Sequence, residues 1–270
     1  MSPANARLVE RVGGLIADGP RSAGTDRPPL IAIVGAQGCG KTTLARAAAE
    51  RFGAVQISID DVYLTRAERE AMARDVHPLF VTRGPPGTHD LVLLQGLIDT
   101  LSTAGPDAVT VIPDFDKRGD DRRPATDGRV LAGRPSAILI DAWCLGAVAE
   151  ETAALAAPVN ALERERDPDG RWRRAVNGYV AGPYADFIAR FDAVVFLKAP
   201  GFDVVLDWRC QQEADLLGIA PADLAPAERD RLAGFIQYFE RITRRMLDGG
   251  VRADIIVPLD RERLPGSLPS

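Results

Sequence analysis

Two glycines, a lysine and a threonine at fixed spacing are the first residues of this chain that could do chemistry. They are Gly35, Gly40, Lys41 and Thr42, in the pattern Gly-x-x-x-x-Gly-Lys-Thr. Glycines let the backbone curl so that successive N–H groups point inward, and a following helix adds partial positive charge at its N-terminus. The lysine can then reach the β- and γ-phosphates of a nucleotide, and the threonine hydroxyl can hold Mg²⁺. The pattern predicts a loop that binds a nucleoside triphosphate.

The residues on either side of this loop support the prediction. An apolar run at 30–34 predicts a buried strand, and an alanine-rich run at 42–52 predicts a helix. A glycine-rich turn without a ligand is the alternative, but it leaves the order of strand, loop, Lys-Thr pair and helix unexplained. The guanine-specificity motif Asn-Lys-x-Asp is absent, which favours ATP. The residues predicted to surround ATP are Gly35, Ala36, Gln37, Gly38, Cys39, Gly40, Lys41, Thr42 and Thr43.

Three aspartates follow two predicted strands directly. Asp60 and Asp61 come after the run 54–59, and Asp141 comes after the run 137–140. Open α/β sheets bind ligands at the carboxyl ends of their strands. We therefore predict that Asp60 is the base that accepts a proton from an acceptor hydroxyl, and that Asp141 serves Mg²⁺ directly or through water. The alternative is that one of the first two aspartates only caps a turn.

A charged segment at 113–128 supplies cations between two predicted strands. It carries Asp116, Lys117 and Arg122 around a glycine. Phosphoryl transfer needs cations that neutralise the transferring group and a closure that excludes water. We predict a small lid here, with the lysine and this arginine as catalytic cations. A charge run is usually only a solvated loop, and that remains the alternative.

A second wall of the predicted pocket is the sequence Arg-Gly-Pro-Pro-Gly-Thr-His-Asp at 83–90. Its arginine and imidazole could hold an anionic acceptor, although His89 could instead only cap the helix that follows. On a predicted helix at 202–217, Arg209 could reach a phosphate, whereas Trp208 is expected in the core. The residues predicted to contact the acceptor are Asp61, Tyr63, Arg83, Thr88, His89 and Asp116.

Strands that alternate with helices must position these groups. The predicted strands lie at 30–34, 54–59, 108–112, 137–140, 193–197 and 253–257, and the predicted helices lie at 42–52, 65–75, 90–101, 171–191 (interrupted near 182–183), 202–217 and 226–247. This alternation is typical of a doubly wound α/β fold, with a mostly parallel sheet and helices on both faces.

The chain is expected to divide into three parts. Residues 1–29 form a short amphipathic helix at 4–18 and a linker, residues 30–264 form the nucleotide-binding domain with its lid near 113–128, and residues 265–270 form a tail.

Composition narrows the function further. A net charge of −5 and a pI near 5.2 argue against a nucleic-acid surface. No apolar run approaches the roughly 20 residues of a membrane span, and the start lacks the apolar core of a signal peptide. Cys39, Cys144 and Cys210 include no Cys-x-x-Cys pair, which indicates a reduced cytoplasmic protein. Nothing in the sequence indicates the oligomeric state.

The motifs together resemble one family of kinases. The segments 35–43, 58–65, 83–90, 116–117, 141–143 and 208–213 occur in the order found in D-glycerate 3-kinases of the plant and fungal type and their bacterial relatives. That family is similar in its core to uridine kinase, phosphoribulokinase and bacterial pantothenate kinase. The resemblance covers about 30–264 and implies a P-loop kinase that uses ATP and Mg²⁺, with Asp60 as its base.

This chain departs from the family pattern at two places. It has Asp141-Ala-Trp where the family usually has Glu-Gly-Trp, which shortens the carboxylate on the metal side. Its lid has Phe115-Asp-Lys-Arg and then Gly119-Asp-Asp-Arg, where the family usually has Tyr-Asp-Lys-Ser and Gly-x-Gly-Asp-Arg. The altered lid bears on the identity of the acceptor more than on the reaction.

We therefore expect an ATP-dependent kinase that phosphorylates a hydroxyl of a small organic acid. D-glycerate giving 3-phosphoglycerate is the favoured reaction. Two alternatives stay open, namely a related kinase with a pantothenate-, sugar-acid- or nucleoside-like acceptor, and a regulatory ATPase without an acceptor. The lid cations and the aspartate at the strand end favour a kinase over an ATPase.

Overall fold

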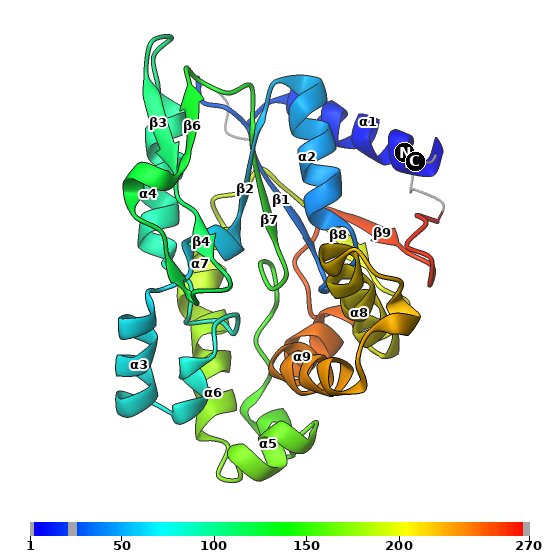
Figure 1. The fold of residues 1–270 in the computed structure, drawn as a ribbon. Helices are drawn as coiled ribbons and strands as arrows, with labels where there is room; N and C mark the ends of the chain where they lie inside the picture. Colours follow the sequence, from blue (N-terminus) through cyan, green and yellow to red (C-terminus); the bar gives the residue numbers. More distant parts are fainter. Residues whose placement is uncertain (1–2, 21–25, 267–270) are drawn as a thin grey trace.

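A parallel sheet of five strands forms the centre of the protein. The computed structural model describes residues 3–20 and 26–266. The strand order is β2-β7-β1-β8-β9, and every pair of neighbours is parallel (Figure 1). The bounds are Leu30–Gly35 for β1, Val55–Ser58 for β2, Ile138–Ala142 for β7, Ala193–Lys198 for β8 and Ile255–Pro258 for β9. The predicted doubly wound α/β fold is confirmed, and the strand predicted at 253–257 lies at an edge of the sheet.

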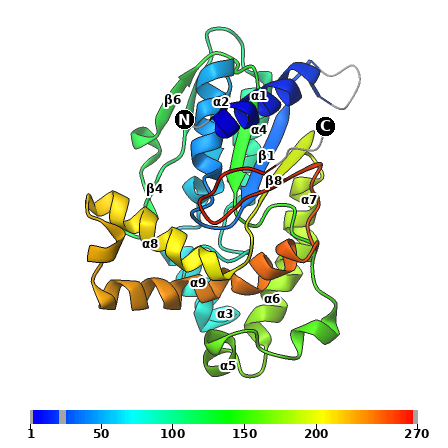
Figure 2. The same ribbon diagram turned by 90° about the vertical axis from the view of Figure 1, so that its right-hand side faces the viewer.

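Helices cover both faces of this sheet (Figures 1 and 2). Two hydrophobic clusters form the core, one on each face of the sheet. Alternate side chains of β1 point to opposite faces, so Val34 belongs to the same cluster as Leu94, and Ile33 belongs to the same cluster as Leu44. Strands buried on both faces require continuous apolar runs, as β1 has. The helices are α1 (Pro3–Asp18), α2 (Lys41–Phe52), α3 (Arg66–Asp75), α4 (Leu91–Thr103), α5 (Ala161–Arg166), α6 (Arg171–Tyr179), α7 (Ala185–Ile188), α8 (Asp203–Leu217) and α9 (Pro226–Leu247).

Local sequence signals place several helix ends correctly. A capping box opens α3, because Thr65 and Glu68 each accept a hydrogen bond from the backbone N–H of the other. Asp90 caps α4 through the N–H of Leu93, and α9 has the predicted bounds. The helix predicted at 4–18 is present as α1 and packs on α2, where Gly13 approaches the ring of Phe52.

The strand predicted at 108–112 is present but lies outside the central sheet. It is β3 (Val109–Ile112), which pairs antiparallel with β6 (Arg129–Ala132), a strand that the sequence did not predict. Its exposed and buried residues alternate, which is typical of a strand with one face in water. Between them, β4 (Phe115–Asp116) and β5 (Asp121–Arg122) form a small hairpin, so the predicted lid segment has regular structure of its own.

The predicted break near Gly182-Pro183 is a π-helical turn. Residues Val180–Tyr184 form this turn and join α6 to α7. A π-helical turn accommodates the proline within the helix, because its backbone hydrogen bonds span five residues and not four, which changes the carbonyl that each N–H contacts. The turn also directs Tyr184, the last of its residues, into the core beside the loop at 83–90.

Parts of the predicted linker and tail, at 21–25 and 267–270, lie outside the described residues. Within the described part of the chain, no helix is both long and apolar enough to cross a membrane.

Candidate active site

The glycine-rich loop lies between β1 and α2, as predicted. Gly38 and Gly40 have φ of +75° and +93°, which L-residues with a side chain rarely adopt. A Cβ at Gly38 would lie 2.8 Å from the Cβ of Trp208, so the loop packs directly on α8. The Nζ of Lys41 donates to the carbonyl of Ala36 at 3.2 Å, which holds the ammonium over the loop. Backbone donors, a helix N-terminus and this cation make a phosphate-binding arrangement.

Asp141 lies beside the loop at the end of β7 and is almost fully buried. Its Oδ2 accepts from Thr42 Oγ1 at 2.8 Å and from Ser58 Oγ at 3.2 Å, and its Oδ1 accepts from Gln56 Nε2 at 2.5 Å. Burial raises the pKa of this carboxyl, against the lowering effects of Lys41 and these hydrogen bonds. The structure therefore brings the two predicted magnesium ligands together.

This pair fits a magnesium ion. Mg²⁺ takes oxygen ligands at about 2.1 Å in octahedral geometry, so adjacent ligand atoms lie roughly 3 Å apart. The Thr42 and Asp141 oxygens are 2.8 Å apart, close to that spacing. The ion could bind both oxygens directly, or bind the hydroxyl and reach the carboxylate through a water.

Asp60 follows β2 and lies at the same edge of the sheet. Its Oδ1 accepts from Tyr63 Oη at 2.6 Å, and its Oδ2 lies 3.4 Å from the Nζ of Lys117. Burial alone would raise the pKa of Asp60, but the lysine charge and the tyrosine hydrogen bond outweigh it and hold that pKa below its usual value. The side chain keeps 33% of its surface exposed. Asp60 is therefore an ionised and accessible carboxylate, as a base must be.

Asp61 caps the turn instead. Its Oδ2 accepts from the backbone N–H of Ser58 at 3.1 Å in a reciprocal capping box. Burial raises the pKa of Asp61 to about 7, against the hydrogen bond from Ser58 and the charge of Lys117. The two neighbouring aspartates thus have opposite environments, one partnered by a lysine and one buried within a turn.

The raised pKa of Asp61 gives a prediction about stability. Because the folded-state pKa lies above the usual 3.8, the folded protein keeps a proton that the unfolded chain has released between about pH 4 and pH 7. This group therefore lowers the free energy of unfolding as the pH rises through that window. Asp61→Asn keeps an oxygen for the Ser58 N–H and removes the titration. We expect the melting temperature to fall less in the variant than in the wild type when the pH is raised from about 5 to about 8.

Thermal unfolding without ligands measures this difference, and Asp107→Asn on an exposed loop is the matched control. Equal pH dependence in the wild type and Asp61→Asn would show that the carboxyl titrates normally.

His89 and Tyr63 form the wall next to Asp60. Their rings stack with centroids 4.8 Å apart, and their backbones pair in a short bridge. His89 is 5% exposed, and its Nδ1 lies 2.6 Å from Tyr184 Oη. Burial lowers the pKa of His89 to about 4, although the charge of Asp60 opposes this. The imidazole is therefore uncharged at neutral pH.

Thr88 is not part of this group. It is fully buried, and its hydroxyl accepts from the N–H of Gly84 at 2.9 Å and donates to the carbonyl of Pro85 at 2.7 Å. These bonds close the turn at 84–88 and leave the hydroxyl with a structural role. The carboxylate of Asp116 also has a local partner, because it accepts from the N–H of Arg118 within the exposed turn between β4 and β5.

The hairpin of the predicted lid segment is held to the rest of the domain by arginines. Arg83 forms an ion pair with Asp120 and donates to the carbonyl of Lys117 at 3.1 Å. Arg122 lies 3.0 Å from Asp90 and donates to the carbonyl of Tyr63 at 2.8 Å. The predicted cations Arg83, Lys117 and Arg122 therefore all lie at or on this hairpin, next to Asp60.

Arg69 is a neighbour of the candidate site that the sequence did not predict. It lies on α3 and is fully buried. Its guanidinium donates at 2.6 Å to the carbonyl of Val81 and at 2.6 Å to the carbonyl of Asp120. It thereby ties the predicted lid segment to the turn at Pro78–Val81, just before the loop at 83–90. Nothing in the sequence separates this arginine from the exposed charges around it on α3.

Arg209 lies on α8 next to the buried Trp208, whose place in the core is confirmed. The guanidinium is 2.8 Å from Glu213, one turn further along the helix. Arg209 therefore has an acidic partner of its own, and a phosphate would have to compete with it.

Solved structures with this arrangement of strands and loop are known. No protein-family model matches the chain, and no curated protein matches it. The D-glycerate 3-kinase from Cryptococcus neoformans is similar with a TM-score of 0.73 and 19% identity over 97% of this chain and 99% of that chain. The protein YGR205w is similar with a TM-score of 0.72 and 21% identity over 100% and 98%. YFH7 from Saccharomyces cerevisiae, described as a candidate P-loop kinase with a circular permutation, has a TM-score of 0.52 and 11% identity over 95% and 98%.

The chain has an α/β P-loop NTPase fold. At 19–21% sequence identity, the similarity to these structures shows the fold. It confirms, for the fold, the resemblance to P-loop kinases seen in the sequence motifs. The P-loop of this fold is the loop at 35–42. Both acidic strand ends described above lie on one side of it, Asp141 after the neighbouring strand β7 and Asp60 after β2 beyond it.

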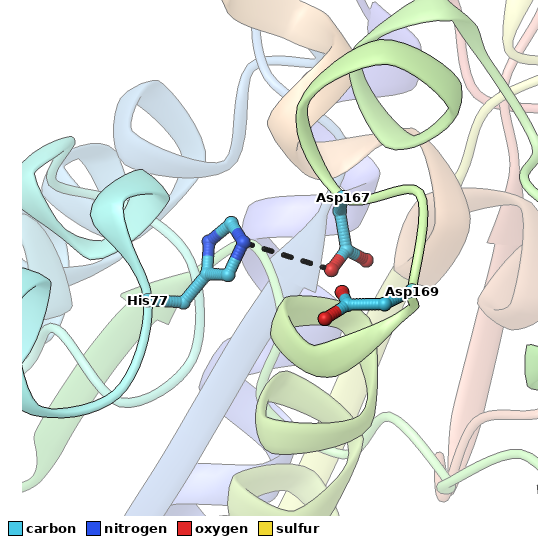
Figure 3. Close-up of side chains that lie close together, drawn as sticks. All are labelled: His77, Asp167 and Asp169. Atoms are coloured by element: carbon cyan, nitrogen blue, oxygen red, sulfur yellow. Dashed lines mark ion pairs between the residues drawn. The ribbon is translucent and has the colours of Figure 1, made fainter.

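A second cluster of polar side chains in the P-loop domain does not suit a metal (Figure 3). His77, Asp167 and Asp169 lie close together, and His77 Nε2 is 3.8 Å from Asp167 Oδ1. However, His77 Nδ1 accepts from the N–H of Leu79 at 3.2 Å, so in the neutral ring Nε2 carries the proton and has no lone pair for a metal. The carboxylate of Asp167 already accepts from the N–H of Trp172 at 2.7 Å. The cluster holds the loop before residue 83 against the start of α6.

Proposed function

We propose that this protein is an ATP-dependent kinase that phosphorylates a hydroxyl of a small organic acid. D-glycerate giving 3-phosphoglycerate is the favoured reaction. The observation that carries the proposal is the ionised Asp60 beside Lys117, on the same sheet edge as the P-loop and Asp141. The likeness in fold to a protein described as a D-glycerate 3-kinase supports the choice of acceptor.

Each group in this arrangement has a role in the proposed reaction. The P-loop N–H groups and Lys41 hold the β- and γ-phosphates. Thr42 and Asp141 would hold Mg²⁺, which when bound would neutralise phosphate charge. Asp60 accepts the proton of the acceptor hydroxyl, while Lys117 and Arg122 approach from the lid. The hydroxyl oxygen bonds to the γ-phosphorus as the bond to the β-γ bridging oxygen breaks, and ADP leaves.

The cations on the acceptor side favour an acid. Lys117 is 57% exposed, and its ammonium lies beside Asp60. The guanidinium of Arg83 is paired with Asp120, a lid carboxylate that an acceptor carboxylate could replace. Arg83 also interacts electrostatically with Tyr63, which places its charge close to the wall of the site. An acceptor carboxylate held by these cations would leave a hydroxyl free to reach Asp60.

A screen of acceptors tests the proposal. Purified protein with ATP and Mg²⁺ is given hydroxy acids, pantothenate, sugar acids and nucleosides one at a time, and ADP formation is followed. We expect D-glycerate to raise ATP consumption well above the basal rate and ³¹P NMR to show a phosphate monoester at C3. Stimulation by another class would correct the acceptor. A slow basal rate that no acceptor raises would favour the regulatory ATPase.

Closure of the lid gives a further prediction. Lys117, Arg118 and Arg122 offer trypsin three cleavage sites within 113–128. If this segment closes over the phosphates, ATP with the acceptor should protect these sites more than ATP alone, because the acceptor adds contacts with the lid cations. Mass spectrometry of the first fragments measures the order of cleavage.

Asp120→Ala is the control for this experiment. It removes the carboxylate that pairs with Arg69 and Arg83, so the lid should be cleaved faster in every state. Equal cleavage of the wild type without ligand, with ATP and with ATP plus acceptor would show that the segment does not close and is an ordinary solvated segment.

A further inference from the structure

The imidazole of His89 has one ring nitrogen without a partner. In the described part of the chain, no hydrogen-bonding group lies within reach of Nε2, although only 5% of the residue's surface is exposed. A buried polar atom left unpaired costs about 1–3 kcal/mol, and natural proteins contain few of them. The other ring nitrogen is fully used. This one needs an explanation.

The partner of Nδ1 fixes which nitrogen carries the proton. Tyr184 Oη accepts from the N–H of Gly87 at 3.1 Å and lies 2.6 Å from His89 Nδ1. Burial raises the pKa of Tyr184 well above its usual value, so the hydroxyl keeps its proton. Among the described contacts its only acceptor is His89 Nδ1. The tyrosine therefore donates to Nδ1, and the imidazole proton resides on Nε2.

The backbone around this pair is built to make the contact. Tyr184 is the last residue of the π-helical turn at 180–184, and such turns recur at functional sites. Gly87 has φ of +101°, and a Cβ there would lie 2.5 Å from the ring of Tyr179. Only glycine brings the N–H this close to the tyrosine hydroxyl without strain. The tautomer of His89 is thus determined by two segments far apart in the sequence.

The unpaired nitrogen belongs to a ring in the candidate site. The His89 ring stacks on the ring of Tyr63, whose hydroxyl donates to Asp60 at 2.6 Å. The charge of Asp60 acts on His89, and burial keeps the imidazole neutral by lowering its pKa to about 4. An anionic group beside Nε2 would be repelled by Asp60, whereas an uncharged oxygen would not.

We propose that His89 donates through Nε2–H to an uncharged hydroxyl oxygen of the acceptor, and that Tyr184 is the positioning residue that fixes this donor. The inference rests on the proposed kinase function and narrows its substrate class. The acceptor carries an acid group for the cations, one hydroxyl for Asp60 and a second hydroxyl for His89. In D-glycerate the second hydroxyl is the one at C2, which is not phosphorylated.

The first test observes the tautomer directly in the ligand-free protein. The chain has only two histidines, so ¹⁵N NMR of the imidazoles is simple, and His77→Gln assigns the signals. We expect His89 to be neutral with the proton on Nε2 at neutral pH. Tyr184→Phe should shift His89 toward a mixture of tautomers, while Tyr179→Phe, which removes a nearby hydroxyl that makes no described contact with His89, should not. A wild-type His89 protonated on Nδ1 overturns the inference.

The second test removes the partner from the acceptor. The probes are D-glycerate and 3-hydroxypropionate, which lacks the C2 hydroxyl and keeps the other groups. An unpaired buried donor is worth about 1–3 kcal/mol, so the wild type should prefer D-glycerate by about 5- to 150-fold in kcat/KM. His89→Phe keeps a ring against Tyr63 and removes the donor, so this preference should fall close to one. An unchanged preference in the variant overturns the inference.

A more conservative variant than His89→Phe protects the test against misfolding. Tyr184→Phe deletes one hydroxyl and should reduce the same preference in part, mainly through KM for D-glycerate, whereas Asp60→Asn should slow both acids equally. If the wild type phosphorylates neither acid, the proposed acceptor has failed. The role of His89 as a donor is then tested by ¹⁵N NMR with ATP and the acid that the screen identifies. This acid must shift the His89 Nε2 signal and leave the His77 signals unchanged. An unshifted Nε2 signal contradicts the inference.

Discussion

Lys41→Ala should abolish phosphoryl transfer while the protein remains folded. Its ammonium lies over the P-loop and donates to the carbonyl of Ala36, while its charge also acts on the buried carboxyl of Asp141. Removal of one preorganised donor from a site of developing charge typically lowers kcat by about 10²–10³-fold. The loss here should be at least that large, because the donor is a full charge next to the transferring phosphate. Steady-state ADP formation with the acceptor measures it.

The matched control for this substitution is Arg46→Ala. It removes one positive charge from the exposed side of the same helix, α2, without touching the P-loop. The control should keep nearly full activity, and both variants should keep the wild-type melting temperature. Near-normal turnover by a folded Lys41→Ala protein would show that the measured activity does not depend on the P-loop.

The P-loop and the acidic strand ends could be predicted because their signals are local. Gly35 to Thr42 is a short pattern whose geometry follows from its own backbone, and Asp60 and Asp141 directly follow apolar runs. In a parallel sheet such strand ends must lie at one edge. The contact between Thr42 and Asp141, which are 99 residues apart, follows from that rule.

The attachment of the lid could not be predicted because it depends on distant pairs. Arg69 appears in the sequence as one charge among several on α3, but it is fully buried against the backbone of Asp120, 51 residues away. A buried arginine satisfied by carbonyls leaves no periodic signal. For the same reason the sequence does not distinguish the closed hydroxyl of Thr88 from one that faces a ligand.

The choice between Asp60 and Asp61 shows the same limit at closer range. Both follow β2, and the sequence leaves open which of them caps the turn. The structure gives the cap to Asp61, through the N–H of Ser58, and partners Asp60 with Lys117 of the lid. A cation from another segment thus separates the environments of two adjacent and identical side chains. The assignment of the base to Asp60 is a prediction for kinetics to test.

Asp60→Asn should slow the reaction with little change in nucleotide binding. The amide keeps the size of the side chain and can still accept from Tyr63, but it cannot take a proton from the acceptor hydroxyl. A positioned base typically contributes about 10²–10⁴-fold, so kcat should fall by that factor. The corresponding loss of transition-state stabilisation is about 3–5 kcal/mol at 1.36 kcal/mol per decade. The affinity for ATP should hold, because the P-loop supplies those contacts.

Asp61→Asn is the matched comparison, since it makes the same change one residue further along the chain. It keeps the cap on the Ser58 N–H and should cost much less activity. If Asp60 mainly held Mg²⁺, its loss would also weaken ATP binding, and added Mg²⁺ would partly restore turnover. A larger loss of kcat in Asp61→Asn than in Asp60→Asn would exchange the two roles. The carboxyl whose pKa is raised to about 7 would then be the base, and turnover would rise with pH through that value.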